Sequence, residues 1–163
     1  MKIKNKILKL AKICHIIAKV LYIASFVVCL SFVALAIALP LSDLTVKLTS
    51  AEIAVLFGGL ALYAFFCIGL LWNVEGIFKS VLQGQSPFSV AVSHYLKKIA
   101  LFSLLLSIVP SLVASIVIKA IYPATELTFP IEFAGIVAGI VLFVISIFFD
   151  YGNELQKTDD ETL

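Results

Sequence analysis

Ile53 to Val74, with the sequence IAVLFGGLALYAFFCIGLLWNV, is a run of twenty-two residues without a charged side chain. Glu52 precedes the run and Glu75 follows it. A helix of this length is about 33 Å long, which is enough to cross a hydrocarbon core of about 30 Å with some tilt. Because lipid cannot hydrogen-bond the backbone, a spanning segment must satisfy its own N–H and C=O groups within a helix. The stretch therefore predicts a transmembrane helix.

Three more uncharged stretches surround this one, at residues 20–39, 99–118 and 133–149. The chain has 163 residues, of which 62% are hydrophobic and only 13% are charged, and its mean hydropathy is +1.14. A soluble domain of this size needs a far more polar surface. The sequence therefore predicts an all-α fold, an integral membrane four-helix bundle that forms a single membrane domain over residues 1–163 and lies in the lipid bilayer.

Residues 2–19 predict an amphipathic helix in front of the first span. At 100° per residue, one side of this helix carries Lys2, Lys6, Lys9, Lys12 and Lys19. The other side carries Ile3, Ile7, Leu10, Cys14 and Ile17. Such a helix lies along an anionic leaflet, so we expect the chain to turn into the membrane near residue 20. We interpret the lysines as a topology signal and interface anchor rather than as a nucleic-acid contact.

Residues 75–98 form the longest polar segment, which predicts a short helical connector between the second and third spans. Its first part continues the second helix until Gly84 stops it. Ser86 is a favoured N-cap and Pro87 a favoured first helical residue, so a new helix is predicted from Pro87 to Lys98.

The second and fourth spans each end at an acidic residue, Glu75 and Asp150 respectively. After the fourth span only a short polar tail, residues 150–163, remains. We interpret the two carboxylates as solvated groups at helix ends. Their expected partners are Lys79, Lys97 or Lys98.

The lysines predict the orientation of the chain. Six precede the first span, three lie in the connector and one lies in the tail, whereas the loop 40–52 has one and Lys119 directly precedes the loop 120–132. Loops rich in Lys stay on the cytoplasmic side. We therefore expect both termini and the connector in the cytosol, with about 26 residues outside, too few for a folded external domain.

Small residues in the third and fourth spans predict helix packing. Serines recur every four residues at Ser103, Ser107, Ser111 and Ser115, with Pro110 as a predicted kink between them. The stripe favours a close helix contact with hydroxyls bonded to the backbone, and a polar permeation path is the alternative. Gly135 and Gly139 form a GxxxG pattern in the fourth span, which predicts a packing face either within the bundle or between the protomers of a homodimer.

No combination of side chains in the sequence predicts a catalytic, cofactor or metal site. The chain has no phosphate-binding loop, no HExxH and no Glu-x-x-His pair. His15 stands next to Cys14, but adjacent helical side chains point apart and cannot chelate one metal ion. No ionisable side chain falls within the predicted span cores, which disfavours ion-coupled transport. We therefore expect a protein that is not an enzyme.

Two segments, FKSVLQGQSPFSVAVSHYLKKIA in the connector and IFFDYGNELQKTDDETL at the end, resemble the bacterial membrane proteins grouped as domain of unknown function 2975. Lys157 departs from that family's pattern, where an acidic residue is usual, and the final Asp-Leu-Thr-Val is reduced to DETL. The resemblance implies a multi-pass protein of the bacterial cytoplasmic membrane with no assigned activity. Members are often encoded beside a very small helix-turn-helix regulator, which implies a partner.

From these features we expect a regulatory, partner-binding protein that presents a cytosolic surface. The resemblance and the predicted topology together imply that this surface holds a small cytosolic DNA-binding regulator, without direct nucleic-acid binding by the chain itself. The residues expected to form it are Pro87, Phe88, Glu154, Leu155 and Gln156. Two alternatives stay open: a small transporter or channel subunit, and a bacteriocin or toxin immunity protein that uses its outer loops or spans.

Overall fold

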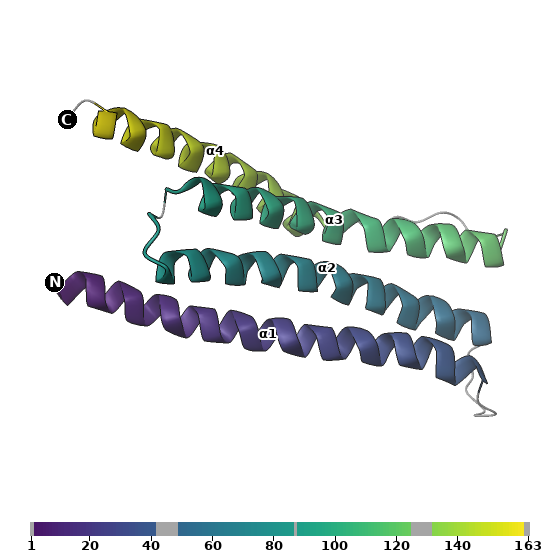
Figure 1. Cartoon of the computed structure of the whole chain (residues 1–163). Coiled ribbons are helices and arrows are strands. Elements are labelled where there is room, and N and C mark those ends of the chain that lie inside the picture. Colours follow the sequence, from purple (N-terminus) through teal and green to yellow (C-terminus); the bar gives the residue numbers. More distant parts are fainter. Residues whose placement is uncertain (1, 42–48, 87, 125–131, 162–163) are drawn as a thin grey trace.

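The computed structural model describes residues 2–41, 49–86, 88–124 and 132–161. These residues form four helices: α1 (Lys2–Leu41), α2 (Ser50–Leu82), α3 (Val90–Ile121) and α4 (Phe133–Glu161) (Figure 1). No strand occurs in the described ranges. All four helices are long and apolar enough to cross a membrane. The predicted all-α, four-helix membrane fold is therefore confirmed.

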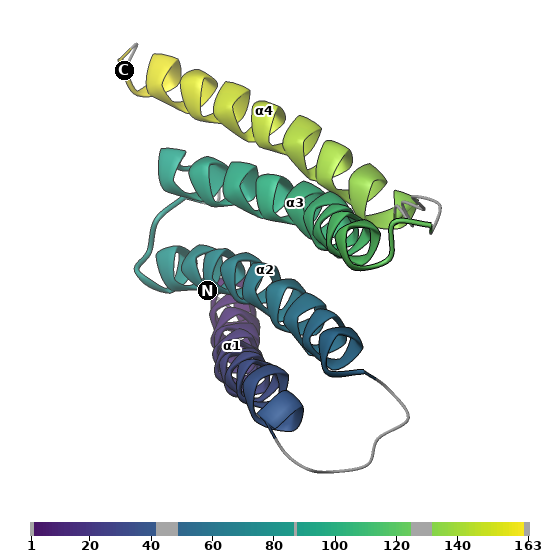
Figure 2. The ribbon, with the colours of Figure 1, turned by 90° about the vertical axis from the view of Figure 1, so that its right-hand side faces the viewer.

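The helices pack in chain order, α1 on α2, α2 on α3 and α3 on α4, and no other pair of helices is in contact within the described residues. Figure 2 shows the resulting row, with α1 at one end and α4 at the other. In the most apolar part of α1 no residue is buried, and many large apolar side chains of α1 and α4 are exposed. In a bilayer these faces meet lipid, which solvates them as well as a protein core would.

The predicted turn near residue 20 is wrong, because α1 is one helix of 40 residues. At 1.5 Å per residue it is about 60 Å long, roughly twice the hydrocarbon thickness. Apart from Pro40 near its end, it contains no helix breaker. Ala11 and Ala18 are buried on one face with His15 between them, and α2 is the helix that covers this face. The N-terminal half of α1 therefore follows α2 instead of bending along a leaflet.

Gly84 ends the second helix as predicted. The N–H of Gln83 donates to the carbonyl of Lys79 at 3.0 Å, and Gly84 has φ +82°, a conformation that favours glycine.

The predicted start of the next helix at Pro87 is corrected, since α3 begins at Val90 with Ser89 as its N-cap residue. The Ser86 hydroxyl accepts the N–H of Phe88 at 3.3 Å and the Ser86 carbonyl accepts the N–H of Ser89 at 3.0 Å, so this serine closes a turn before the helix. Pro87 itself lies outside the described residues.

The predicted polar tail is helical, because α4 continues to Glu161. Both termini and the α2–α3 turn lie at the same end of the row (Figure 1). We call this the inner end, and the end at which α1 ends, α2 begins and α3 ends the outer end.

Candidate functional site

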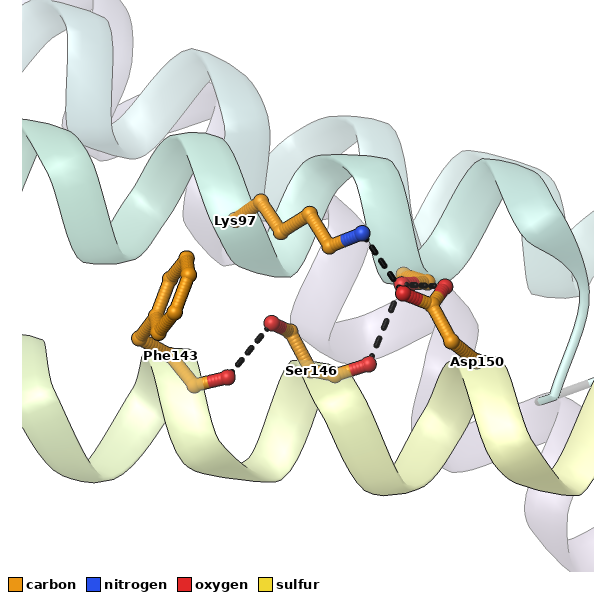
Figure 3. Close-up of polar contacts among 5 residues, drawn as sticks. Lys97, Phe143, Ser146 and Asp150 are labelled. Atoms are coloured by element: carbon orange, nitrogen blue, oxygen red, sulfur yellow. Dashed lines mark hydrogen bonds and ion pairs between the residues drawn. The ribbon is translucent and has the colours of Figure 1, made fainter.

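A polar cluster joins α3 to α4 at the inner end. Lys97 Nζ lies 2.6 Å from Asp150 Oδ2, and the Ser93 hydroxyl contacts both Asp150 Oδ1 and the carbonyl of Ser146, the latter at 3.2 Å (Figure 3). The hydroxyl of Ser146 donates to the carbonyl of Phe143 at 2.6 Å. The predicted pairing of Asp150 with a connector lysine is therefore confirmed.

Glu75 has a different partner from those predicted. Its Oε1 lies 3.5 Å from Nδ1 of His15 on α1, rather than beside a lysine. Neighbouring helices cover the last turns of α2, where Ser80 is buried. Glu75 lies on the face of α2 that meets α1, so its partner comes from α1. The pair joins the long N-terminal half of α1 to the inner end of α2.

The two segments behind the family resemblance contact each other at the inner end. The Ser86 hydroxyl donates to Gln156 Oε1 at 3.1 Å, and the rings of Phe88 and Phe149 have centroids 5.1 Å apart. A Cβ placed on Gly152 would lie 2.9 Å from Phe88 Cδ1, so the missing side chain of Gly152 lets the Phe88 ring lie this close to α4. The turn before α3 and the polar end of α4 thus form one surface, although more than sixty residues separate them in the sequence.

The predicted partner-binding residues divide into two groups on this surface. Phe88 and Gln156 contact each other's segments and stay partly exposed, Phe88 with 40% of its area. Glu154 and Leu155 are exposed, Leu155 with 50% of its area. We call this surface, made of residues 83–86, 88–89 and 149–156, the inner-end platform.

The predicted packing glycines contact α3 of the same chain. A Cβ on Gly135 would overlap Ser107 Oγ at 1.9 Å, and one on Gly139 would lie 2.8 Å from Leu104 Cγ. Ser103 Oγ donates to the carbonyl of Gly135 at 3.1 Å. The GxxxG face therefore packs within the bundle, and it is not available for a homodimer.

The serine stripe serves two different helix contacts. Ser103 and Ser107 face α4, and the Ser107 hydroxyl donates to the carbonyl of Ser103 at 2.9 Å, as expected for a packing contact. Ser111 and Ser115 instead line a groove between α3 and α2. Ser107 therefore lies in the contact between α3 and α4, whereas Ser111 lines a partly open space.

An acidic side chain reaches into the membrane-spanning part of the bundle. The Tyr63 hydroxyl donates to Oε2 of Glu132 at 2.9 Å. Tyr63 is the eleventh of the twenty-two uncharged residues of α2, so it lies about 15 Å from either end of that run. The Glu132 carbonyl accepts the N–H groups of Gly135 and Ile136, which places Glu132 at the first turn of α4.

The contact between α4 and α3 places Glu132 at the same depth. Gly135 packs on Ser107, which precedes Lys119 at the outer end of α3 by twelve residues, or about 18 Å of helix. The first turn of α4 therefore lies well inside the span of α3. The expectation that no ionisable side chain enters the span cores is wrong for Glu132.

The length of the fourth uncharged stretch could have revealed this position. Seventeen residues, 133–149, make a helix of only about 25 Å, shorter than the hydrocarbon core. Glu132 precedes this short stretch directly. Its depth still depends on where α4 docks along α3, which no pattern in the sequence specifies.

Two cavities separate α2 and α3 toward the outer end. One, of about 370 Å³, has a polar part made by Tyr63, Ser111 and Ser115 and a wall that includes Gly59 and Pro110. The other, of about 460 Å³, is lined by small and apolar residues on the opposite side. A Cβ on Gly58 or Gly59 would meet no atom within 4 Å. The outer halves of α2 and α3 are therefore loosely packed, in contrast to the α3–α4 contact.

Among the described residues, no group of three or more His, Cys, Asp or Glu side chains is arranged to hold a metal ion. Comparison with known proteins gives no match to a family model, to a curated protein or to a solved structure. The resemblance to domain of unknown function 2975 therefore stays a prediction.

Proposed function

We propose that this multi-pass membrane protein is a non-enzymatic regulatory protein, which binds a small cytosolic protein through the inner-end platform. The observation that carries the proposal is the contact of Ser86 and Phe88 with Gln156 and Gly152. This contact brings together the two segments that carry the family resemblance, and it is the resemblance that implies a partner.

The shape of the inner end supports this proposal. Tyr22 and Trp72 form an edge-to-face pair with centroids 5.4 Å apart, as expected for aromatic residues near a membrane interface. Beyond this level α2 continues to Leu82, and α4 continues from Asp150 to Glu161. Rigid helices that project by about 12 to 18 Å suit the presentation of a binding surface.

The side chains of the platform have the composition of an interface. Tyr151 and Leu155 expose 60% and 50% of their area, although they lie beyond the fourth uncharged stretch. Glu154 and Gln156 beside them are polar and exposed. Exposed aromatic and aliphatic side chains next to polar ones are common in protein-binding sites.

The side of the membrane follows from the lysines. Ten of the twelve lysines belong to the inner-end segments in the sequence, which supports a cytosolic inner end in a bacterial cytoplasmic membrane. The partner is a small helix-turn-helix regulator, held at the membrane and away from its DNA site.

Site-specific photo-crosslinking tests the platform. A photoreactive amino acid at Leu155 should crosslink in the cell to one small cytosolic protein, the proposed helix-turn-helix regulator, whereas one at Val141 on the exposed apolar face of α4 should not. Leu155→Glu should reduce the yield at a probe placed at Tyr151 at least fivefold, and Lys157→Gln serves as the matched control. Equal yields from positions 155 and 141 would contradict the proposal.

A second candidate function, a small transporter, is favoured by the Glu132 carboxylate at depth, because ionisable groups inside spans mark substrate or ion pathways in many membrane proteins. Flux of a cationic solute into liposomes containing the purified chain tests it. Flux that is lost in Glu132→Gln supports transport, and the absence of flux in the wild-type chain counts against it.

A further inference from the structure

The Glu132 carboxylate is an unusual group for its depth. A carboxylate inside a span is unfavourable unless it is paired, hydrogen-bonded or reached by water. Tyr63 supplies one hydrogen bond to the carboxylate, at 2.9 Å, and Glu132 directly precedes the first residue of α4. A charged carboxylate in a medium of low dielectric constant attracts a cation strongly.

The space next to this carboxylate is shaped for an apolar body. Tyr63, which binds Glu132 through its hydroxyl, also lines the 370 Å³ groove between α2 and α3. Most of the groove wall is aliphatic, and Gly59 leaves it open where a side chain would otherwise fill it. Ser111 adds a hydroxyl on the α3 side.

We propose that this groove binds a lipophilic organic cation, with the apolar body between α2 and α3 and the cationic centre beside Tyr63 and Glu132. Charge selects the occupant, because a carboxylate repels an anionic amphiphile and gives a neutral acyl chain no advantage. A bare metal ion fits less well, since hard cations need six or more oxygen ligands and one carboxylate supplies two. The proposal concerns binding alone, and it does not depend on the inner-end platform.

Equilibrium binding to the full chain in lipid nanodiscs tests the proposal. The probes are tetraphenylphosphonium and tetraphenylborate, which have nearly the same shape and opposite charge. The wild-type chain should bind tetraphenylphosphonium saturably and should not bind tetraphenylborate above the level of empty nanodiscs. Glu132→Gln should weaken tetraphenylphosphonium binding at least tenfold, whereas Glu52→Gln, which changes an acidic residue at the outer end of α2, should leave the affinity unchanged.

A substitution in the groove provides a test in which the carboxylate is intact. Gly59→Leu should fill the space and weaken tetraphenylphosphonium binding at least fivefold, and thermal unfolding shows whether each variant is folded. Equal binding of the two probes by the wild-type chain would overturn the proposal. Equal affinity of wild type and folded Glu132→Gln would overturn it as well. If Glu132→Gln does not fold, the comparison of the two probes and Gly59→Leu decide the matter. None of these outcomes affects crosslinking at Leu155, so the platform and the groove are judged separately.

Discussion

Ser93 and Ser146 are almost completely buried, with 1% and 0% of their areas exposed, and both hydroxyls bond to groups on α3 or α4. In lipid there is little hydrophobic drive between helices, so close packing and hydrogen bonds must hold them together. Gly135, Gly139 and Gly152 complete this pattern, since each lies where a side chain would overlap α3 or the turn before it. Single atoms at these positions therefore determine how α4 docks.

Removing the Ser93 hydroxyl should weaken this docking. Ser93→Ala removes the hydroxyl that joins α3 to the carbonyl of Ser146 and to an oxygen of Asp150 on α4, which should cost about 0.5–2 kcal/mol of unfolding free energy. Unfolding in mixed detergent micelles measures the loss. Ser31→Ala is the matched control, because Ser31 is exposed and bonds only to its own helix at Val27, so it should differ little from wild type. Equal losses for both variants would show that the cluster contributes nothing specific.

Adding a methyl group should destabilise the protein at one glycine and have little effect at another. In Gly139→Ala the new Cβ lies 2.8 Å from Leu104 Cγ and 3.1 Å from the carbonyl oxygen of Ala100, so α4 must shift, at about 1–3 kcal/mol. In Gly58→Ala it meets no atom within 4 Å, and stability should stay within about 0.5 kcal/mol of wild type. Thermal unfolding of the two variants in the same detergent checks the difference. The interpretation fails if Gly58→Ala is the more destabilised of the two.

At the scale of the helices, length and docking depth explain most of the architecture. α1 is longer than a span because nothing in its sequence breaks the helix and because Ala11, His15 and Ala18 follow α2. α4 is displaced toward the inner end, since its first turn meets Ser107 rather than the outer turns of α3. The displacement extends α4 into the platform and carries Glu132 to the level of Tyr63.

The continuity of α1 predicts a distance. Spin labels at Lys6 and Leu30, both exposed, are separated by twenty-four residues, or about 36 Å along an unbroken helix. Pulsed electron paramagnetic resonance in nanodiscs should give one narrow distribution near this value, in a variant whose three cysteines are replaced by serine. A bend near residue 20 would give a clearly shorter or broader distribution.

At the scale of the whole molecule, the helices form an open row in which α1 and α4 do not touch within the described residues. The two central helices, α2 and α3, each contact two other helices, and α1 and α4 each contact one. Lipid therefore takes part in the structure on most faces. The two candidate sites lie at different heights of this row, the platform at the inner end and the groove toward the outer end.

The lysine distribution predicts the orientation of this row. A cytosol-dependent reporter fused after Leu163 should be active, and the same reporter inserted at Thr45 or Thr125 should be inactive. A reporter that works only outside the cytosol should give the reverse pattern at all three positions. An external C-terminus would contradict both the orientation and the cytosolic partner.

The sequence alone was enough to predict the four helices that can span a membrane, the stop at Gly84 and the pairing of Asp150 with a connector lysine. These features depend on hydropathy, glycine conformation and charge, which act over a few residues or along one helix. Only the tertiary structure decided that α1 is unbroken, that Phe88 packs on Gly152 and that Glu132 meets Tyr63. The continuity of α1 depends on its packing against α2. The other two contacts depend on the register in which α4 packs along its neighbours, and periodic patterns of small and apolar residues allow several such registers.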